Sequence, residues 1–257
     1  MLTAQGDVTD SASLGHMQLI FSPGGTLLES LLYSVGFDRN AGPDIRAVYA
    51  GGLLNVLTAL PPSVTRAIYI STTGVYGSAG GEWVDEETPT DPQREGGQAS
   101  LAAERVLAAH PLGRRSVILR LAGIYGPGRV PYLDKLRSGD PIAAPSAGWL
   151  NLIHVDDAAR IVVAADEWLA AQPPADKPHV FCVSDGHPVV RGEYYAEAAR
   201  LIGAPPPRFI DPPADSPAAA RALADRRVRN DKLRRVLGVD FTFPTYREGL
   251  AAILRDK

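Results

Sequence analysis

The stretch IYISTTGVYG, residues 68–77, decides the fold. It starts as an apolar, β-branched run and passes directly into a turn rich in Ser and Thr that ends in Tyr-Gly. Strands that are buried on both faces read as continuous apolar runs, which is typical of parallel sheets covered by helices. Residues 66–71 therefore predict a central parallel strand whose carboxyl end carries hydroxyl side chains.

Helical and strand patterns alternate on both sides of this stretch, which predicts an α/β layered fold. Apolar residues at helical spacing predict a helix over residues 45–60, which ends before a Pro-Pro pair. The same patterns predict further strands at 30–36, 115–122, 149–155 and 179–186, and further helices at 99–110, 157–171 and 192–203, the last closed by Gly203.

Composition limits the classes of function. The chain has 257 residues, of which 45% are hydrophobic and 21% charged, as expected for a globular protein with a core. Its net charge of −3 favours neither a nucleic-acid partner nor an anionic membrane surface. No apolar run approaches the roughly 18 residues of a membrane span, and the first residues lack the pattern of a signal peptide, so we expect a cytoplasmic protein. The single cysteine, Cys182, excludes an internal disulfide and is interpreted as a buried core thiol rather than a reactive one.

The stretch at 68–77 resembles the SSxxVYG signature of the extended short-chain dehydrogenase/reductases, the NAD-dependent epimerase/dehydratase family. Other segments resemble this family in the family's own order, from residue 6 to residue 254. They are GDVTD (6–10), LRLAGIYGPGR (119–129), NLIHVDDAAR (151–160) and the two C-terminal segments VSDGHPVVRGEYY and KLRRVLGVDF–YREGL. The resemblance implies a Rossmann-like, mostly parallel sheet in residues 1–145 and a smaller C-terminal α+β substrate-side lobe in residues 146–257, interleaved with the first.

The family opens with a strand, the glycine loop G-x-x-G-x-x-G and a helix, which hold the pyrophosphate of the dinucleotide. This chain begins at what resembles the third strand, so we expect an N-terminally truncated sheet that lacks the glycine-rich βαβ unit. Such a sheet has an exposed edge near residues 6–9, which favours association into a homo-oligomer. The glycine pair in SPGGT (22–26) lacks the required spacing and is interpreted as a turn.

The next family landmark is P-x-x-x-Y-x-x-x-K followed by a glutamate, which supplies the acid/base tyrosine and the lysine that lowers its pKa. Pro92 and Glu104 keep the register of this motif, but Gly96 stands at the tyrosine position and Ser100 at the lysine position. Thr72 aligns with the hydroxyl that orients the substrate and is the predicted catalytic residue of this motif set.

The family's proton relay also uses an asparagine, and this chain has Tyr49 at that position while Asn55 keeps the second asparagine. A replacement acid is conceivable, because a phenol whose pKa is lowered can transfer a proton. Our hypothesis is that Tyr76 takes this catalytic role with Arg120 or Arg39 nearby. The alternative is that Tyr76 packs beneath the loop.

The resemblance also implies contacts to a cofactor, NAD or NADP, and to a substrate. The segment GDVTD resembles the strand end whose acidic residue meets the adenine, and the loop after GIYGPG would face the substrate. The implied cofactor contacts are Asp7, Val8, Ser34, Val35, Gly36, Ser71, Leu121, Ala122, Gly123 and Ile124, and the implied substrate contacts are Thr73 and Arg129.

Two further features have two interpretations each. His154 precedes two aspartates, and it is either catalytic or a strand-end histidine bonded to backbone or to Asp157, with the aspartates capping a helix. The acidic segment EWVDEET (82–88) is either a solvated surface or a substrate contact. No His, Cys, Asp and Glu grouping has the spacing of zinc ligands, so we expect no metal.

The sequence thus predicts an NAD(P)-binding epimerase, dehydratase or reductase-like protein that acts on a nucleotide sugar or another small carbonyl substrate, with a degenerate Tyr/Lys pair. Whether this chain turns a substrate over stays open. The alternatives are a non-catalytic ligand-binding or interaction protein on the same scaffold, and an incomplete gene product.

Overall fold

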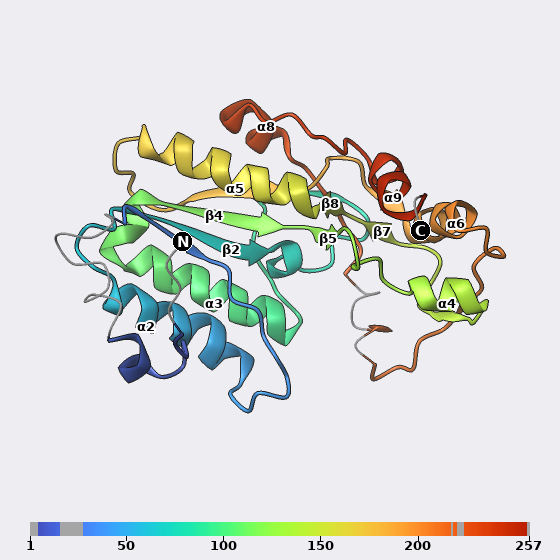
Figure 1. Cartoon of the computed structure of the whole chain (residues 1–257), viewed down its shortest axis with the longest axis horizontal. Helices are drawn as coiled ribbons and strands as arrows, with labels where there is room; N and C mark the ends of the chain where they lie inside the picture. The colour runs from blue at the N-terminus through green and yellow to red at the C-terminus, as the bar shows by residue number, and fades with distance from the viewer. Residues whose placement is uncertain (1–4, 16–27, 217, 220–223, 256–257) are drawn as a thin grey trace. The chain divides into compact units, whose positions relative to one another are not determined.

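The computed structural model describes residues 5–15, 28–216, 218–219 and 224–255 (Figure 1). The SPGGT turn predicted at 22–26 lies outside these residues. The chain divides into two compact units, between which it passes several times. Unit 1 comprises residues 1–75, 90–120 and 162–181, and unit 2 comprises residues 76–89, 121–161 and 182–257.

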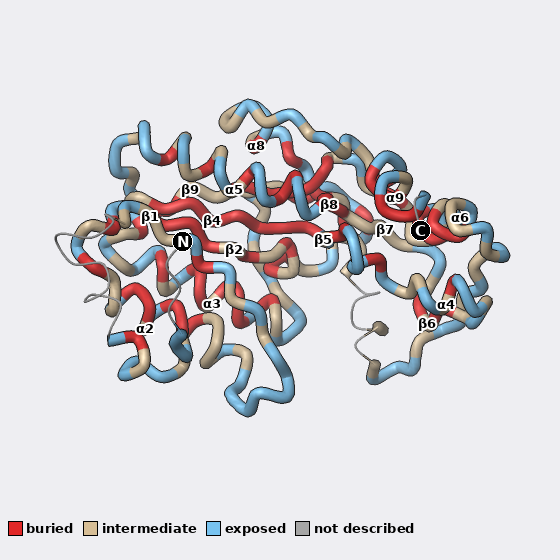
Figure 2. The backbone as a smooth tube through the Cα atoms, viewed as in Figure 1, coloured by how far each residue is buried: buried red, intermediate tan, exposed pale blue. Residues whose placement is uncertain are grey.

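A four-stranded sheet with the strand order β1-β2-β4-β9 forms the centre of unit 1. β1 (Ser30–Tyr33) pairs in parallel with β2 (Arg66–Thr72), so that Tyr33 lies opposite Tyr69. β4 (Ser116–Leu121) is buried at every residue, as Figure 2 shows, and β9 (His179–Val183) completes the sheet. The expectation of an α/β fold with a mostly parallel sheet is confirmed.

Helices cover both faces of this sheet (Figure 1). α2 (Gly52–Ala59), which continues the π-helical turn η2 (Ala47–Gly51), and α3 (Glu95–Ala109) lie on one face. The second half of α5 (Val155–Ala170) lies on the other face, where Asp166 accepts hydrogen bonds from Arg66 on β2. The described residues of unit 1 also form the short 3-10 helices η1 (Ser11–Leu14), η3 (Thr73–Val75) and η4 (Pro111–Arg115).

The described residues of unit 2 form short strand pairs and helices around a core rich in tyrosine. The pairs are β5 (Gly123–Tyr125) with β8 (Leu152–His154), β7 (Trp149–Leu150) with β10 (Val189–Val190), β6 (Ile142–Ala143) with β11 (Phe209–Ile210), and β3 (Trp83–Val84) with β12 (Arg227–Val228). The helices are α4 (Leu133–Ser138), α6 (Arg191–Leu201), α8 (Asp231–Leu237) and α9 (Tyr246–Leu254). The core includes Tyr125, Tyr194, Tyr195 and Tyr246.

Most of the predicted elements are confirmed, and the differences have local causes. The strand predicted at 149–155 is two strands, because β7 pairs antiparallel with β10 and β8 pairs in parallel with β5. Between them, the side chain of Asn151 bonds the carbonyl of Arg226 and the N–H of Val228. The helix predicted at 99–110 begins at Glu95, four residues earlier. Gly203 does follow α6 in a left-handed conformation, with φ of 67°.

Candidate functional site

Two hydroxyl side chains stand at the carboxyl end of β2 in unit 1. The Oγ1 atom of Thr72 accepts a hydrogen bond of 3.0 Å from the N–H of Gly74, so its own hydrogen remains available to an acceptor. Thr73 begins η3 and is buried. Thr72 thus presents a donor of the kind that orients a carbonyl oxygen.

Behind this strand end lies a buried polar cluster. The Glu104 carboxylate on α3 accepts hydrogen bonds from the Ser71 hydroxyl at 2.6 Å and from Arg120 Nε at 3.0 Å. Arg120 NH2 donates to the second oxygen of Glu104 at 2.7 Å. All three side chains are buried, and the hydroxyl of Ser71, an implied cofactor contact, already donates its hydrogen to Glu104.

The two residues that the motif alignment assigns to the family's tyrosine and lysine positions lie on α3. Gly96 carries no side chain, and Ser100 is buried and hydrogen-bonded to Tyr69. Burial raises the pKa of Tyr69 well above its usual range, which keeps this phenol protonated. These positions therefore provide no titrating pair at neutral pH.

The neighbouring Gly97 is fixed by a backbone contact. A Cβ atom at this position would lie 2.2 Å from the carbonyl oxygen of Gly74, in the turn that follows Thr72. α3 therefore packs directly on this turn, and only glycine allows that approach.

The other implied cofactor contacts of unit 1 lie in loops. Ser34, Val35 and Gly36 follow β1, and both Ser34 and Gly36 are exposed. Asp7 is exposed, and the backbone N–H and the hydroxyl of Thr9, both bonded to its Oδ1 atom, hold the pKa of its carboxyl below the usual value. The carbonyl of Val8 accepts a 2.9 Å hydrogen bond from the retained Asn55 on α2, which fixes this loop.

Tyr76 belongs to unit 2 and is buried, with 2% of its surface exposed. Its hydroxyl lies 3.1 Å from the Cys182 sulfur atom, and the Cys182 N–H donates to Glu86 at 2.7 Å. This burial favours the packing interpretation of Tyr76, while its acid/base role stays a hypothesis. Glu86 of the acidic segment 82–88 is bonded to the backbone of β9.

The segment 121–129 leads from β4 into the Gly-Pro loop of unit 2. Its backbone is fixed by hydrogen bonds from Ala122 N to Val183 O and from Gly123 N to Asn151 O, both 2.9 Å long. Leu121 and Ala122 are buried, Ile124 is half-buried, and the side chain of Arg129 is exposed to solvent. Of these residues, Arg129 offers a charged group to a ligand.

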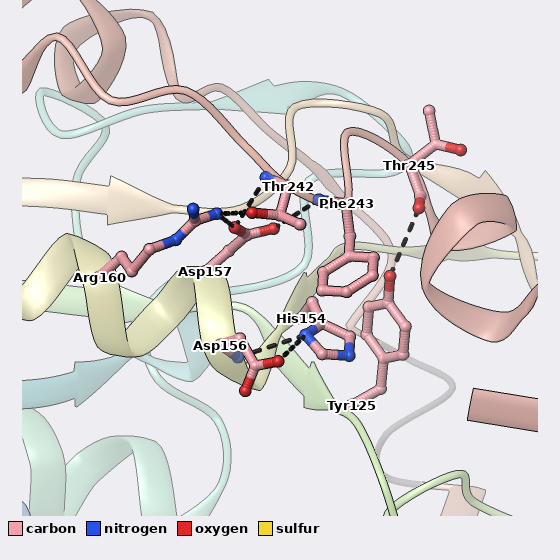
Figure 3. Close-up of polar contacts among 8 residues, drawn as sticks. All are labelled: Tyr125, His154, Asp156, Asp157, Arg160, Thr242, Phe243 and Thr245. Atoms are coloured by element: carbon pink, nitrogen blue, oxygen red, sulfur yellow. Dashed lines mark hydrogen bonds and ion pairs between the residues drawn. The ribbon is translucent and has the colours of Figure 1, made fainter. Parts of the chain in front are cut away.

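His154 and the two following aspartates have separate partners in unit 2 (Figure 3). Asp156 donates its N–H to His154 Nδ1 at 3.2 Å, and the imidazole packs against the Phe243 ring at a tilt of 39°, with 3.9 Å between ring centroids. Burial lowers the pKa of His154, only partly offset by Asp156 and Asp157, so the ring is neutral at pH 7. This geometry supports the strand-end interpretation, with backbone as the bonding partner.

Asp157 forms hydrogen bonds with the segment around residues 242–243, which is distant in the sequence. Its two carboxylate oxygens accept the N–H groups of Thr242 and Phe243, both at 2.9 Å, and Arg160 pairs with the same carboxylate (Figure 3). The sequence indicated a helix cap here. The observed contact instead joins α5 to the FTFP segment, and local sequence gives no signal for it.

In the described part of the chain, no group of three or more His, Cys, Asp or Glu side chains could hold a metal ion. No described helix is long and apolar enough to cross a membrane.

Comparisons with known proteins agree with this architecture. Residues 38–181 match the model of the NAD dependent epimerase/dehydratase family. Protein YeeZ from Escherichia coli (strain K12) is 37% identical over 153 residues, which are 59% of this chain and 52% of YeeZ. A 3-diazoavenalumate denitrifying reductase from a Streptomyces species is 30% identical over 185 residues, 65% of this chain and 58% of that protein. The chain thus spans somewhat over half the length of these two relatives.

Among solved structures, a functionally unknown conserved protein from Silicibacter pomeroyi is 34% identical to this chain. The alignment has a TM-score of 0.70 and covers 91% of this chain and 81% of that protein. The similarity therefore extends over both units, beyond the residues that the family model matches.

Proposed function

The chain belongs to the NAD dependent epimerase/dehydratase family, and on this premise we propose that it binds a nicotinamide dinucleotide, NAD or NADP, and acts on a small carbonyl substrate such as a nucleotide sugar. The observation that carries the proposal is the free hydroxyl hydrogen of Thr72 at the carboxyl end of β2, beside the exposed loop that follows the parallel strand β1. In open α/β sheets, ligands bind outside the carboxyl ends of the strands.

The residues of unit 1 fit a dinucleotide in part. Ser34 and Gly36 expose backbone beyond β1, and a Cβ at Gly36 would meet nothing within 4 Å, so a flat ring can approach it closely. Asp7 holds an anionic carboxylate in solvent, with its second oxygen available to the amino group of an adenine. The bound dinucleotide would supply the hydride chemistry.

Residues of this chain would bind the substrate and orient it. The Thr72 hydroxyl would donate a hydrogen bond to the substrate carbonyl oxygen, and Thr73 would line the same turn. Arg129 would attract a phosphate or carboxylate of the substrate, because a guanidinium stays charged at every physiological pH. Tyr76 is the hypothetical proton donor, and a Tyr76→Phe variant with unchanged turnover would remove it from the mechanism.

A second candidate is a ligand-binding protein without turnover, and a specific observation favours it. Gly96 and the buried Ser100 leave the family's acid/base positions without a titrating group. By name, the Streptomyces relative is a reductase, which favours the first candidate. NADH oxidation with a panel of carbonyl compounds, measured on a chain that binds NADH, separates the two.

A matched pair of aspartates tests the cofactor site. Asp7 and Asp38 are both exposed, and each accepts the N–H two residues further on, at 2.8 and 2.9 Å. Replacing either with Ala removes one carboxylate and one such turn. We expect Asp7→Ala to weaken NADH binding about tenfold, as befits one lost hydrogen bond to a charged group, in a fluorescence titration that Asp38→Ala leaves unchanged. Equal affinities of both variants would contradict the placement of the adenine at Asp7.

A further inference from the structure

Unit 2 contains a cavity of about 420 Å³ beside α4 and the end of α9. Pockets that bind small molecules range from about 300 to 1,000 Å³ and combine apolar walls with a few polar groups. Here the apolar lining is contributed by Val130, Leu133, Ile253 and Leu254, and the polar lining by Tyr132, Asp134, Lys135 and Arg137. Its composition is therefore that of a ligand pocket.

Tyr132, which lines this cavity, has an unusual backbone conformation. With φ of 59° and ψ of 15°, it is the one residue other than glycine with positive φ among the described residues. A left-handed conformation is costly for an aromatic residue, and such outliers cluster at ligand sites. The ring is held edge-on against Tyr195, with 5.7 Å between centroids, so its position is fixed before any ligand arrives.

The charge of the lining points to an anion. Lys135 is half-buried, donates one hydrogen bond of 3.3 Å to the carbonyl of Pro141, and lies 5.9 Å from the Tyr132 ring centroid. An ammonium has three donors, and no carboxylate pairs with it among the described residues. Arg137 and Asp134 form an ion pair with each other at 3.3 Å, so their charges largely cancel. Lys135 is left as the cation that a ligand can neutralise.

We propose that this cavity is a binding site for a small molecule with one anionic group and an apolar, preferably aromatic, body. The anion contacts Lys135, and the body lies against Tyr132 between Leu133 and Ile253. Every residue of the site belongs to unit 2, and the proposal does not depend on the proposed dinucleotide binding.

Calorimetric titration with phenylbutyrate, and with phenylbutanol as its uncharged counterpart, tests the proposal on the whole chain. We expect saturable binding of phenylbutyrate to one site and at least about tenfold weaker binding of the alcohol, because the alcohol lacks the charge that Lys135 neutralises. No saturable binding by the folded wild-type chain, or equal affinity for both compounds, would overturn the proposal.

Substitutions in the cavity test whether phenylbutyrate binds there. Lys135→Met should reduce phenylbutyrate affinity about tenfold, whereas Lys177→Met, which removes an exposed ammonium from unit 1, should leave it unchanged. Leu133→Trp should abolish binding by filling the cavity. Retained affinity in both Lys135→Met and Leu133→Trp would place the ligand elsewhere and contradict the proposal. Displacement of phenylbutyrate by NADH would also overturn it, since the cavity would then be part of the cofactor site.

Discussion

Glu104 and Arg120 form a doubly bonded ion pair inside unit 1, with 6% and 8% of their side chains exposed. Removing water from two charges is costly, and in the folded chain their mutual attraction offsets that cost only while both partners are present. Glu104 also accepts a hydrogen bond from the hydroxyl of Ser71, the residue that precedes the catalytic candidate Thr72. We therefore expect a change of charge at Glu104 or Arg120 to affect the stability of the carboxyl end of β2.

Glu104→Gln should therefore destabilise the protein by about 3–5 kcal/mol, because it removes the carboxylate charge that pairs with the buried Arg120 guanidinium. The apolar replacement of the whole cluster, Ser71→Ala with Glu104→Met and Arg120→Met, should recover most of that loss. Urea unfolding of both variants measures the difference. If the apolar variant were as unstable as Glu104→Gln, the charge argument would fail.

Because the Asp185 carboxyl is buried, we predict that the stability of the protein depends on pH. It is 2% exposed, its Oδ1 accepts the His187 N–H, and its Oδ2 has no partner among the described residues. Burial raises the pKa of this carboxyl from 3.8 to about 7, with Glu248 and Asp157 adding to the shift. The folded state therefore holds a proton that the unfolded state releases, and stability falls as pH rises from about 4 to about 7.

Asp185→Asn removes this ionisation and should stabilise the protein above pH 7 by about 2–4 kcal/mol relative to its effect at pH 4, which is the free-energy equivalent of the shift. Unfolding curves at the two pH values measure it, with the exposed Asp176→Asn as the control. An effect of Asp185→Asn that is the same at both pH values would contradict the predicted titration.

Two adjacent glycines of α3 should respond in opposite directions. Gly97→Ala places a Cβ atom 2.2 Å from the Gly74 carbonyl oxygen, so α3 must move away from the turn after Thr72. At Gly96 the nearest atom to such a Cβ lies at 3.8 Å, an ordinary contact. We expect Gly96→Ala to raise stability by up to about 1 kcal/mol through helix propensity and Gly97→Ala to lower the melting temperature. Similar shifts for both would show that the packing at Gly74 is not tight.

The Asp157 contact can be followed by hydrogen exchange. Asp157→Ala removes the acceptors of the Thr242 and Phe243 N–H groups, so exchange in residues 240–245 should accelerate. Asp156→Ala is the matched control, because its side chain is 69% exposed and contacts neither N–H group. Unchanged exchange in Asp157→Ala would mean that other contacts hold this segment.

The sequence predicted the features that depend on local pattern. The apolar run at 66–71, the hydroxyls that follow it and the register of Glu104 in α3 were all readable, because strand and helix periods are local properties. The partners of these residues were not. Glu104 meets Arg120 from another element, and Asp157 reaches a segment 85 residues away. Such contacts depend on how elements pack, and residue spacing along the chain does not encode that.

The site is only partly readable for the same reason. The alignment with the family motif indicated that Thr72 follows the central strand, and the structure adds the Gly74 contact that leaves its hydrogen available. The alignment could not indicate that Tyr76 is buried against Cys182, since the side chain of a tyrosine in a turn can face either the core or the solvent. The cavity at Tyr132 gave no signal either, because a left-handed tyrosine has no sequence pattern of its own.

The central claim, that this chain binds a nicotinamide dinucleotide, is tested most directly by calorimetric titration of the folded chain with NADH and with NADPH at two temperatures, so that a zero enthalpy at one temperature cannot hide binding. The account predicts saturable binding of at least one of them to a single site. The absence of heat at both temperatures, from a sample whose circular dichroism and cooperative unfolding show it to be folded, would contradict it.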